Sequence, residues 1–329
     1  MDENINLFSP FKIKNINFKN RIVFPPMVRF HTISNDGKVN ENLIKHYEKL
    51  AKDGVGFIIV EATCVSKDGK LRENQLGIWD DSFIDGLSKI TEVCHKENVP
   101  VFLQLHHAGF FEKISEVKEE VLDNILNDFV KAVERAKLCG YDGVEIHAVH
   151  KYLICQLNSP LWNKRTDKFG GKTHFERLYF SRELIKRTKH LFDDNFLLSF
   201  RIAGNEPYLN DGIILSQILE KEGVDLLHVS FGIPDPEIKQ AVKVLETPSD
   251  FPLDWIIFAA KEIRKNINIP VISVSKIKTE QQASYVIENK LTEFVAVGRA
   301  QLFIQYSWVE KAKKEYLNRI NNIIELFQF

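Results

Sequence analysis

Short apolar runs alternate with longer, polar-faced segments along most of the chain. The runs are rich in Val, Ile, Leu and Phe and occupy positions 22–27, 57–62, 101–105, 143–148, 196–202, 225–230, 270–275 and 293–298. Runs of this length are typical of buried β-strands. The segments between them are long enough for helices, for example 41–54, 81–99, 175–192, 252–267 and 280–290. In the third of these, Leu178, Leu184 and Leu191 recur at the spacing of one helix face.

The order of these elements predicts an α/β fold. A strand followed by a helix, repeated about eight times, indicates parallel strands joined by crossover helices, and eight such units close into a (β/α)8 TIM barrel. Gly54, Gly140 and Gly223 stand where helices are expected to end. We find no linker or low-complexity tract, so we expect one domain over residues 1–329. The irregular stretch 232–252 is a candidate cover for the barrel mouth.

Composition narrows the functional classes. The 329 residues carry a formal net charge of -1, so no basic field attracts nucleic acid or an anionic membrane. The first ten residues lack the features of a secretory signal, and no apolar run approaches the ~20 residues that span a bilayer. The four cysteines are far apart in sequence, which argues against a disulfide framework, a zinc ribbon or an iron–sulfur cluster. We therefore expect a cytoplasmic protein.

Polar residues gather at the ends of the predicted strands, where barrel enzymes place their chemistry. In chain order these ends hold Pro26, Met27, Val28, Glu61, Ala62, Gln104, His147 to Tyr152, Arg201, Ser230, Ser275, Lys276, Gly298 and Arg299. The last two ends suggest a phosphate site, because Gly298 permits close backbone approach and Arg299 can pair with a phosphate oxygen. The alternative is a turn glycine beside a solvated arginine.

Arg201 ends an apolar strand, and a buried guanidinium is costly unless it meets an anion. One interpretation is a structural ion pair with Glu61 or Glu145. The other is an anion that develops on a bound cofactor, with the amide of Gln104 bonded to the same ring.

The stretch EIHAVHKYLICQLNSP, residues 145–160, places His147, His150 and Tyr152 close together. The two histidines would face opposite sides of a continuous strand, whereas a turn after His147 would direct both into the mouth. A metal site would need a third ligand, for example His106, and no H-E-x-x-H or carboxylate triad is present. A second interpretation is two edge histidines bonded to backbone. A third is two imidazole donors that hold a substrate oxygen while Tyr152 delivers a proton.

Several motifs carry a family resemblance. They are LFSPFKIKNINFKNRIVFPPM, GFIIVEATCV, LQLHHAG, EIHAVHKYLICQLNSPLWNKRTDKFGG and FVAVGRA, in this order. The sequence resembles the Old Yellow Enzyme family of flavin-dependent oxidoreductases, especially its shorter bacterial branch, over nearly its whole length. The (β/α)8 barrel of that family agrees with the strand count made above.

The resemblance implies non-covalently bound FMN, with NADH or NADPH as reductant. The implied FMN contacts are Pro26, Met27, Val28 and Ala62 on one side of the ring, Gln104, His147 and Arg201 at the ring, and Ser275, Lys276, Gly298 and Arg299 at the phosphate. The implied reaction is reduction of the C=C bond of an α,β-unsaturated carbonyl compound, with hydride passing from FMN N5 to the β-carbon. His147 and His150 would hold the carbonyl oxygen and Tyr152 would protonate the α-carbon, with Phe30 at the substrate rim.

Departures from the family pattern limit what the resemblance implies. Val28 stands where cysteine or threonine is usual, and Lys151 where glycine is common. The long segment that normally follows HAG and caps the mouth is missing, so we expect a shortened capping segment and a site open to bulky enones. Residues 232–252 or a neighbouring subunit could cover the mouth instead.

Two other functions stay open. One is an FMN oxidoreductase of quinones, nitro compounds or flavin, which would not require Tyr152. The other is a barrel that binds FMN or a phosphorylated ligand without turnover. Longer family members carry an iron–sulfur and second-nucleotide region whose cysteines are absent here, so we expect electrons to pass directly from nicotinamide to FMN. The partners expected are a small enone or enal and, as a candidate state, further copies in a homo-oligomer.

Overall fold

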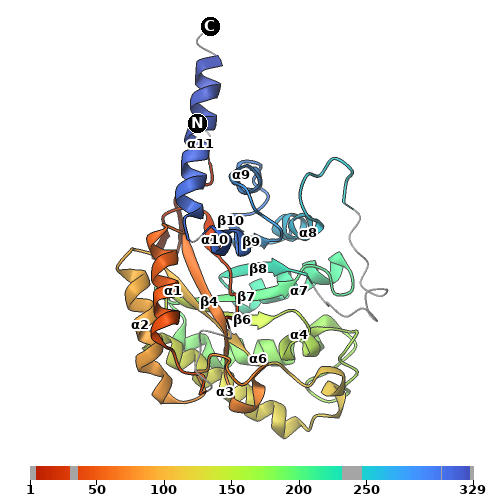
Figure 1. Ribbon diagram of the computed structural model, residues 1–329. Helices are drawn as coiled ribbons and strands as arrows, with labels where there is room; N and C mark the ends of the chain where they lie inside the picture. The colour runs from red at the N-terminus through yellow and green to blue at the C-terminus, as the bar shows by residue number, and fades with distance from the viewer. Residues whose placement is uncertain (1–4, 30–35, 232–246, 305, 327–329) are drawn as a thin grey trace.

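The computed structural model describes residues 5–29, 36–231, 247–304 and 306–326. Eight parallel strands form a closed barrel in the order β10-β3-β4-β5-β6-β7-β8-β9, with helices around it (Figure 1). The strands are β3 (Ile22–Phe24), β4 (Phe57–Cys64), β5 (Val101–His106), β6 (Gly143–Ala148), β7 (Leu197–Ala203), β8 (Leu226–Ser230), β9 (Val271–Val274) and β10 (Phe294–Ala296). Each overlaps one of the eight apolar runs, so the predicted barrel is confirmed.

Eleven helices are present in the described residues, and all but the last surround the barrel. They are α1 (Glu41–Lys52), α2 (Ile84–His95), α3 (Glu119–Leu138), α4 (Leu153–Asn158), α5 (His174–Arg177), α6 (Tyr179–Thr188), α7 (Leu209–Glu222), α8 (Trp255–Arg264), α9 (Glu280–Glu288), α10 (Arg299–Phe303) and α11 (Trp308–Leu326). Short 3-10 turns include η4 (Phe111–Glu116) and η5 (Lys189–Leu191). The single helix predicted over 175–192 is wrong: the backbone leaves helical geometry at Leu178, which separates α5 from α6.

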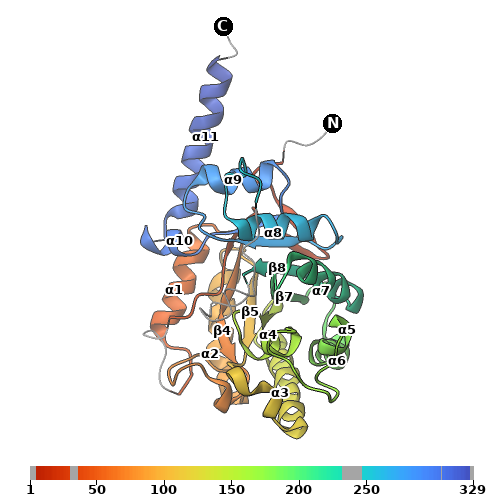
Figure 2. The ribbon, with the colours of Figure 1, turned by 90° about the vertical axis from the view of Figure 1, so that its right-hand side faces the viewer.

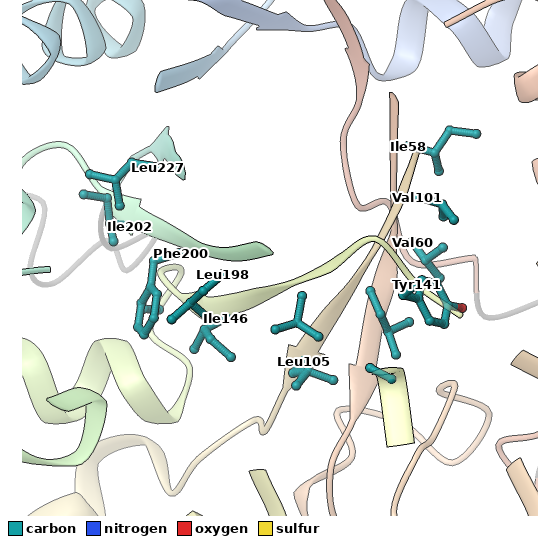
Figure 3. Close-up of a cluster of buried hydrophobic side chains, with 14 of the residues drawn as sticks. Ile58, Val60, Val101, Leu105, Tyr141, Ile146, Leu198, Phe200, Ile202 and Leu227 are labelled. Carbon is teal, nitrogen blue, oxygen red and sulfur yellow. The ribbon is translucent and has the colours of Figure 1, made fainter. Parts of the chain in front are cut away.

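The strands bury two different faces. On β7, Leu198, Phe200 and Ile202 belong to the apolar layer between the strands and the helices. Figure 3 shows these three side chains with others of the same layer. Ser199 and Arg201 alternate with them and face the barrel interior, because successive side chains of a strand point to opposite sides. The helix-facing positions therefore supply packing, and the interior positions near the strand ends are available for chemistry.

A hairpin that the sequence did not reveal closes the amino-terminal end of the barrel. It consists of β1 (Phe11–Ile13) and β2 (Ile16–Phe18). The ring of Phe18 lies 4.9 Å from that of Phe57 and 5.1 Å from that of Phe294, at the first residues of β4 and β10. This aromatic contact seals one end, so the carboxyl ends of the strands form the accessible mouth.

The last helix, α11, extends away from the barrel in both views (Figures 1 and 2). Its base is fixed, because Trp308, Val309 and Ala312 are buried. The carboxylate of Asp53, next to α1, accepts hydrogen bonds from the backbone N–H groups of Val309 at 2.9 Å and Glu310 at 3.3 Å. None of the helices in the described ranges is long and apolar enough to cross a membrane.

Candidate functional site

A cavity of about 970 Å³ lies across the carboxyl ends of the strands. It brings together many of the predicted site residues, namely Pro26, Met27, His150, Arg201, Ser275, Lys276, Gly298 and Arg299. Ser230, Phe231 and Ile256 add to its wall. Five other predicted site residues stand near the carboxyl ends of strands but do not line the cavity, namely Val28, Ala62, Gln104, His147 and Tyr152. Phe30 lies outside the described residues.

The turn after β6 brings the predicted catalytic side chains together. The strand ends at Ala148, and His150 and Lys151 both have a left-handed backbone, with φ of 61° and 63°. Helix α4 then starts after Tyr152. The ring centroids of His147 and His150 are 5.3 Å apart, and those of His147 and Tyr152 are 4.9 Å apart. The chain thus reverses after His147, which places both imidazoles and the phenol in one cluster.

His106, at the end of β5, belongs to the same cluster. Its ring lies 4.4 Å from that of Tyr152 and 5.2 Å from that of His147. Both of its ring nitrogens are buried without a hydrogen-bond partner, and burial lowers its pKa to about 3. No group of three His, Cys, Asp or Glu side chains in the described ranges is arranged to hold a metal ion. The sequence had indicated His106 only as a candidate third metal ligand.

The two histidines of the turn are neutral. Burial lowers the pKa of His147 well below its ordinary value, and nearby imidazoles and Arg201 act in the same direction. Burial and Arg201 likewise lower the pKa of His150. A neutral imidazole has one N–H donor and one acceptor nitrogen. The Nε2 atom of His150 lies 3.0 Å from Oγ of Ser230, which leaves Nδ1 for other contacts.

The phenol of Tyr152 carries its proton and can therefore act as a proton donor. Burial raises the pKa of its phenol, and the nearby charge of Arg201 opposes that rise. The phenol is therefore protonated at neutral pH.

Arg201, on β7, is buried and forms no ion pair among the described residues. Its Nε atom has no hydrogen-bond partner. Glu145 binds Gln104 and His228 instead, and Glu61 accepts a hydrogen bond from the backbone N–H of Arg29 at 3.0 Å. The structural pair considered for Arg201 is thus not formed, and the guanidinium is available to an anionic ligand.

The ends of β9 and β10 present further cations to the cavity. The ammonium of Lys276 lies 2.8 Å from the Asp254 carboxylate, so part of its charge is compensated within the protein. Arg299 is exposed at the start of α10 and forms no ion pair in the described part of the chain. A Cβ at Gly298 would come within 2.9 Å of the sulfur of Met27, so this glycine allows the two segments to pack closely. Arg299 is therefore the better candidate for a phosphate contact.

Most of the stretch 232–252, the candidate cover for the mouth, lies outside the described residues. The connection after β5, where a shortened segment was expected, is short and held by hydrogen bonds. Only residues 107–118 join β5 to α3, with η4 in the middle. Arg165, in the segment after α4, is buried and donates hydrogen bonds to the carbonyl oxygens of Ile114 at 2.7 Å and Val117 at 2.6 Å. The sequence predicted a shortened segment here but not what holds it.

The fold and the site define a (β/α)8 barrel with a large, cation-lined ligand cavity at its carboxyl end. The sequence profile of the NADH:flavin oxidoreductase / NADH oxidase family matches residues 6–121 and 111–318, and the chain belongs to this family. The two matched segments meet at the shortened connection between β5 and α3.

A relative and three solved structures place the chain further. An NADH oxidase of Thermoanaerobacter brockii is 35% identical over 349 residues, which cover 97% of this chain and 52% of the relative. The chain thus spans about half the length of that relative. A 2-naphthoyl-CoA reductase complex superposes with a TM-score of 0.80 at 21% identity, over 92% of this chain and 51% of the other.

Two further structures are of similar length to this chain. The old yellow enzyme homologue from Zymomonas mobilis gives a TM-score of 0.73 at 22% identity, over 90% of this chain and 89% of the other. Morphinone reductase gives 0.77 at 20% identity, over 95% and 90%. At these identities the likeness to solved structures establishes the barrel fold.

Proposed function

We propose that this chain is an FMN-dependent oxidoreductase that takes electrons from NADH or NADPH and reduces the C=C bond of α,β-unsaturated carbonyl compounds. Family membership supports the use of a flavin and a nicotinamide. The observation that carries the choice of reaction is the cluster of His147, His150 and Tyr152 at the end of β6, beside a buried Arg201 without a counter-ion. The proposed substrate is a small enone or enal.

The residues at the mouth fit FMN. A volume of about 970 Å³ lies within the range of roughly 300–1,000 Å³ in which small-molecule sites usually fall. Arg201 and Gln104 would hold the pyrimidine edge of the ring, and Arg299 the phosphate. The remaining predicted contacts are Pro26, Met27, Val28, Ala62, His147, Ser275, Lys276 and Gly298. When bound, FMN supplies a hydride to the acceptor.

The side chains of the β6 turn would do the rest of the chemistry. His147 and His150 would donate hydrogen bonds to the carbonyl oxygen, which withdraws electrons from the double bond and makes its β-carbon electrophilic. Because both imidazoles are neutral, they polarise the carbonyl without protonating it. Tyr152 would deliver the proton to the α-carbon.

We expect Tyr152→Phe to slow the reduction of cyclohexenone by about 10²-fold or more, the usual worth of a positioned acid. The reduction of the bound flavin by NADH or NADPH should be unaffected. Anaerobic stopped-flow spectroscopy of the purified yellow protein would measure the two half-reactions separately. Tyr208→Phe, at a half-exposed surface tyrosine, is the matched control.

Protein that stays colourless after incubation with FMN would contradict the proposed cofactor. Full cyclohexenone activity in Tyr152→Phe would contradict the proposed proton donor.

The NADH oxidase relative favours a second candidate, the reduction of quinones or other acceptors that need no proton on carbon. The same Tyr152→Phe variant separates the two functions, because it should leave quinone reduction intact. A protein that reduces menadione but not cyclohexenone would support this second function.

A further inference from the structure

A buried polar layer lies in the barrel interior one step below the catalytic cluster. It consists of Gln104 on β5, Glu145 on β6 and His228 on β8, none of which is more than 1% exposed. The interior of such barrels is ordinarily filled by branched apolar side chains. Taking a carboxylate out of water is costly unless its oxygens are well bonded. A charged group at this depth therefore calls for a role.

The sheet register brings these three residues together. Gln104 stands opposite Glu145 on neighbouring strands, and Arg201 stands opposite His228. Glu145 precedes His147 by two residues, so both point to the barrel interior and Glu145 lies deeper. The side chain of Gln104 donates from Nε2 to Oε1 of Glu145 at 2.7 Å. Nδ1 of His228 lies 2.8 Å from the other carboxylate oxygen.

The chemistry of the carboxylate fixes how both neighbours are oriented. An ionised carboxylate only accepts hydrogen bonds, so it must meet the NH2 end of the Gln104 amide and a protonated Nδ1 of His228. The oxygen of the amide is then turned away from Glu145. Likewise the free nitrogen of His228, Nε2, carries a lone pair, and it has no partner among the described residues.

We propose that Glu145 is a positioning residue for the flavin. It orients the Gln104 amide so that the amide oxygen accepts a hydrogen bond from the N–H of the flavin pyrimidine edge. It also places a negative charge beneath Arg201. This inference rests on the proposed function, because it concerns the edge of FMN that Gln104 would contact. Without the carboxylate, the amide is free to present its NH2 end to that N–H, which is a donor facing a donor. The negative charge of Glu145 also opposes the charge that the reduced ring acquires near Arg201.

Glu145→Gln tests this arrangement in the full-length protein reconstituted with FMN. We expect the Kd for FMN, measured by flavin fluorescence, to rise about tenfold, as for a lost hydrogen bond to a buried group. The midpoint potential of the bound flavin should move to a more positive value. Glu206→Gln removes another carboxylate, a partly buried one that contacts Cys155 outside the barrel interior, and should change neither quantity.

Transposing the pair gives a rescue. In the double variant Gln104→Glu with Glu145→Gln, the new carboxylate again presents an acceptor to the mouth, and the new amide can still bond it and His228. We expect this variant to recover FMN affinity to within about threefold of the wild type, since the hydrogen bonds are conserved in number. A Glu145→Gln protein that binds FMN like the wild type at an unchanged potential would overturn the proposal, as would a double variant no better than the single one.

One measurement needs neither FMN nor a variant at Glu145. In the apo-protein, 15N NMR of labelled histidine, assigned with His228→Asn, should report the Nδ1-protonated tautomer of His228. The Nε2-protonated tautomer would overturn the proposal. Wild-type protein that fails to bind FMN would instead refute the proposed function, and the tautomer would still decide the orientation of the layer.

Discussion

At the residue scale, the mouth of the barrel combines neutral imidazoles with the buried guanidinium of Arg201. Burial lowers the pKa of His106 to about 3 and that of His107 to about 4, and it also lowers the pKa of His147 and of His150 well below the ordinary value. Arg201 carries a buried positive charge beside them. A ligand at this site would thus meet uncharged donors on one side and a guanidinium on the other, which suits an acceptor that becomes anionic during the reaction.

The buried histidines make the stability of the protein depend on pH. The folded protein protonates His106 only near pH 3, whereas the unfolded chain does so near 6.5. Between these values the unfolded state binds more protons, so the free energy of unfolding falls as the pH is lowered. We expect the free energy of unfolding of His106→Phe to depend less steeply on pH than that of the wild type. The difference in slope should be ~1.4 kcal/mol per pH unit between pH 4.5 and 6, which corresponds to about one proton.

Urea unfolding of the two proteins at several pH values would measure this slope. An equal slope in both would mean that His106 is accessible to protons in the folded state.

At the scale of elements, the connection between β5 and α3 is bonded to a distant part of the chain. The guanidinium of Arg165 is buried and ties this connection to the segment after α4, and it also pairs with the carboxylate of Asp167. The backbone N–H of Lys164 adds a bond to the hydroxyl of Ser115 at 3.2 Å. The short connection is therefore held by the body of the protein.

We expect Arg165→Ala to reduce the free energy of unfolding by about 3 kcal/mol, because two buried carbonyl oxygens lose a charged donor. Amide hydrogen exchange should accelerate locally, over residues 111–118, before any global change. Exposed Lys164→Ala serves as the neighbouring control and should have little effect. Uniform acceleration across the whole barrel would contradict a local role for Arg165.

At the scale of the whole molecule, the two ends of the barrel have different tasks. The amino-terminal end is sealed by aromatic rings from the hairpin β1–β2, and the carboxyl end carries the cavity. This division lets packing at one end support chemistry at the other without sharing residues.

Phe18→Ala should therefore destabilise the protein by about 3–5 kcal/mol, the usual cost of deleting a buried aromatic ring. Phe175→Ala, at a ring that is 51% exposed, should cost less than about 0.5 kcal/mol. Chemical unfolding monitored by circular dichroism would compare them. Equal losses in the two variants would show that the hairpin does not seal the barrel.

The barrel itself could be predicted because each strand is a compact apolar run, and the candidate site residues could be listed because they stand at or near the ends of those runs. The hairpin was missed because its strands have three residues each, too few to show a periodicity. The break at Leu178 was missed because the apolar spacing continues through it. Thr173 and Glu176 form a capping box, but it marks the start of α5 and gives no signal for a break four residues later.

The supporting contacts of the site could not be predicted, because they join residues far apart in sequence. The bond of Gln104 to Glu145, the pairing of Lys276 with Asp254, and the contact of His150 with Ser230 all depend on the barrel having closed. Lysine itself gives no hint of the left-handed backbone at residue 151, although the glycine that is common there in the resembled family is consistent with it.

The alternation along β7 has a consequence for how such a chain can change over evolutionary time. One inserted residue in this strand would exchange its two faces, moving the guanidinium of Arg201 among the side chains that contact the helices and a phenyl ring into the mouth. Insertions and deletions are therefore tolerated in the connections between strands, whereas within a strand they disrupt both the core and the site. A change in length between β5 and α3 lies outside the strands and therefore leaves this alternation unchanged.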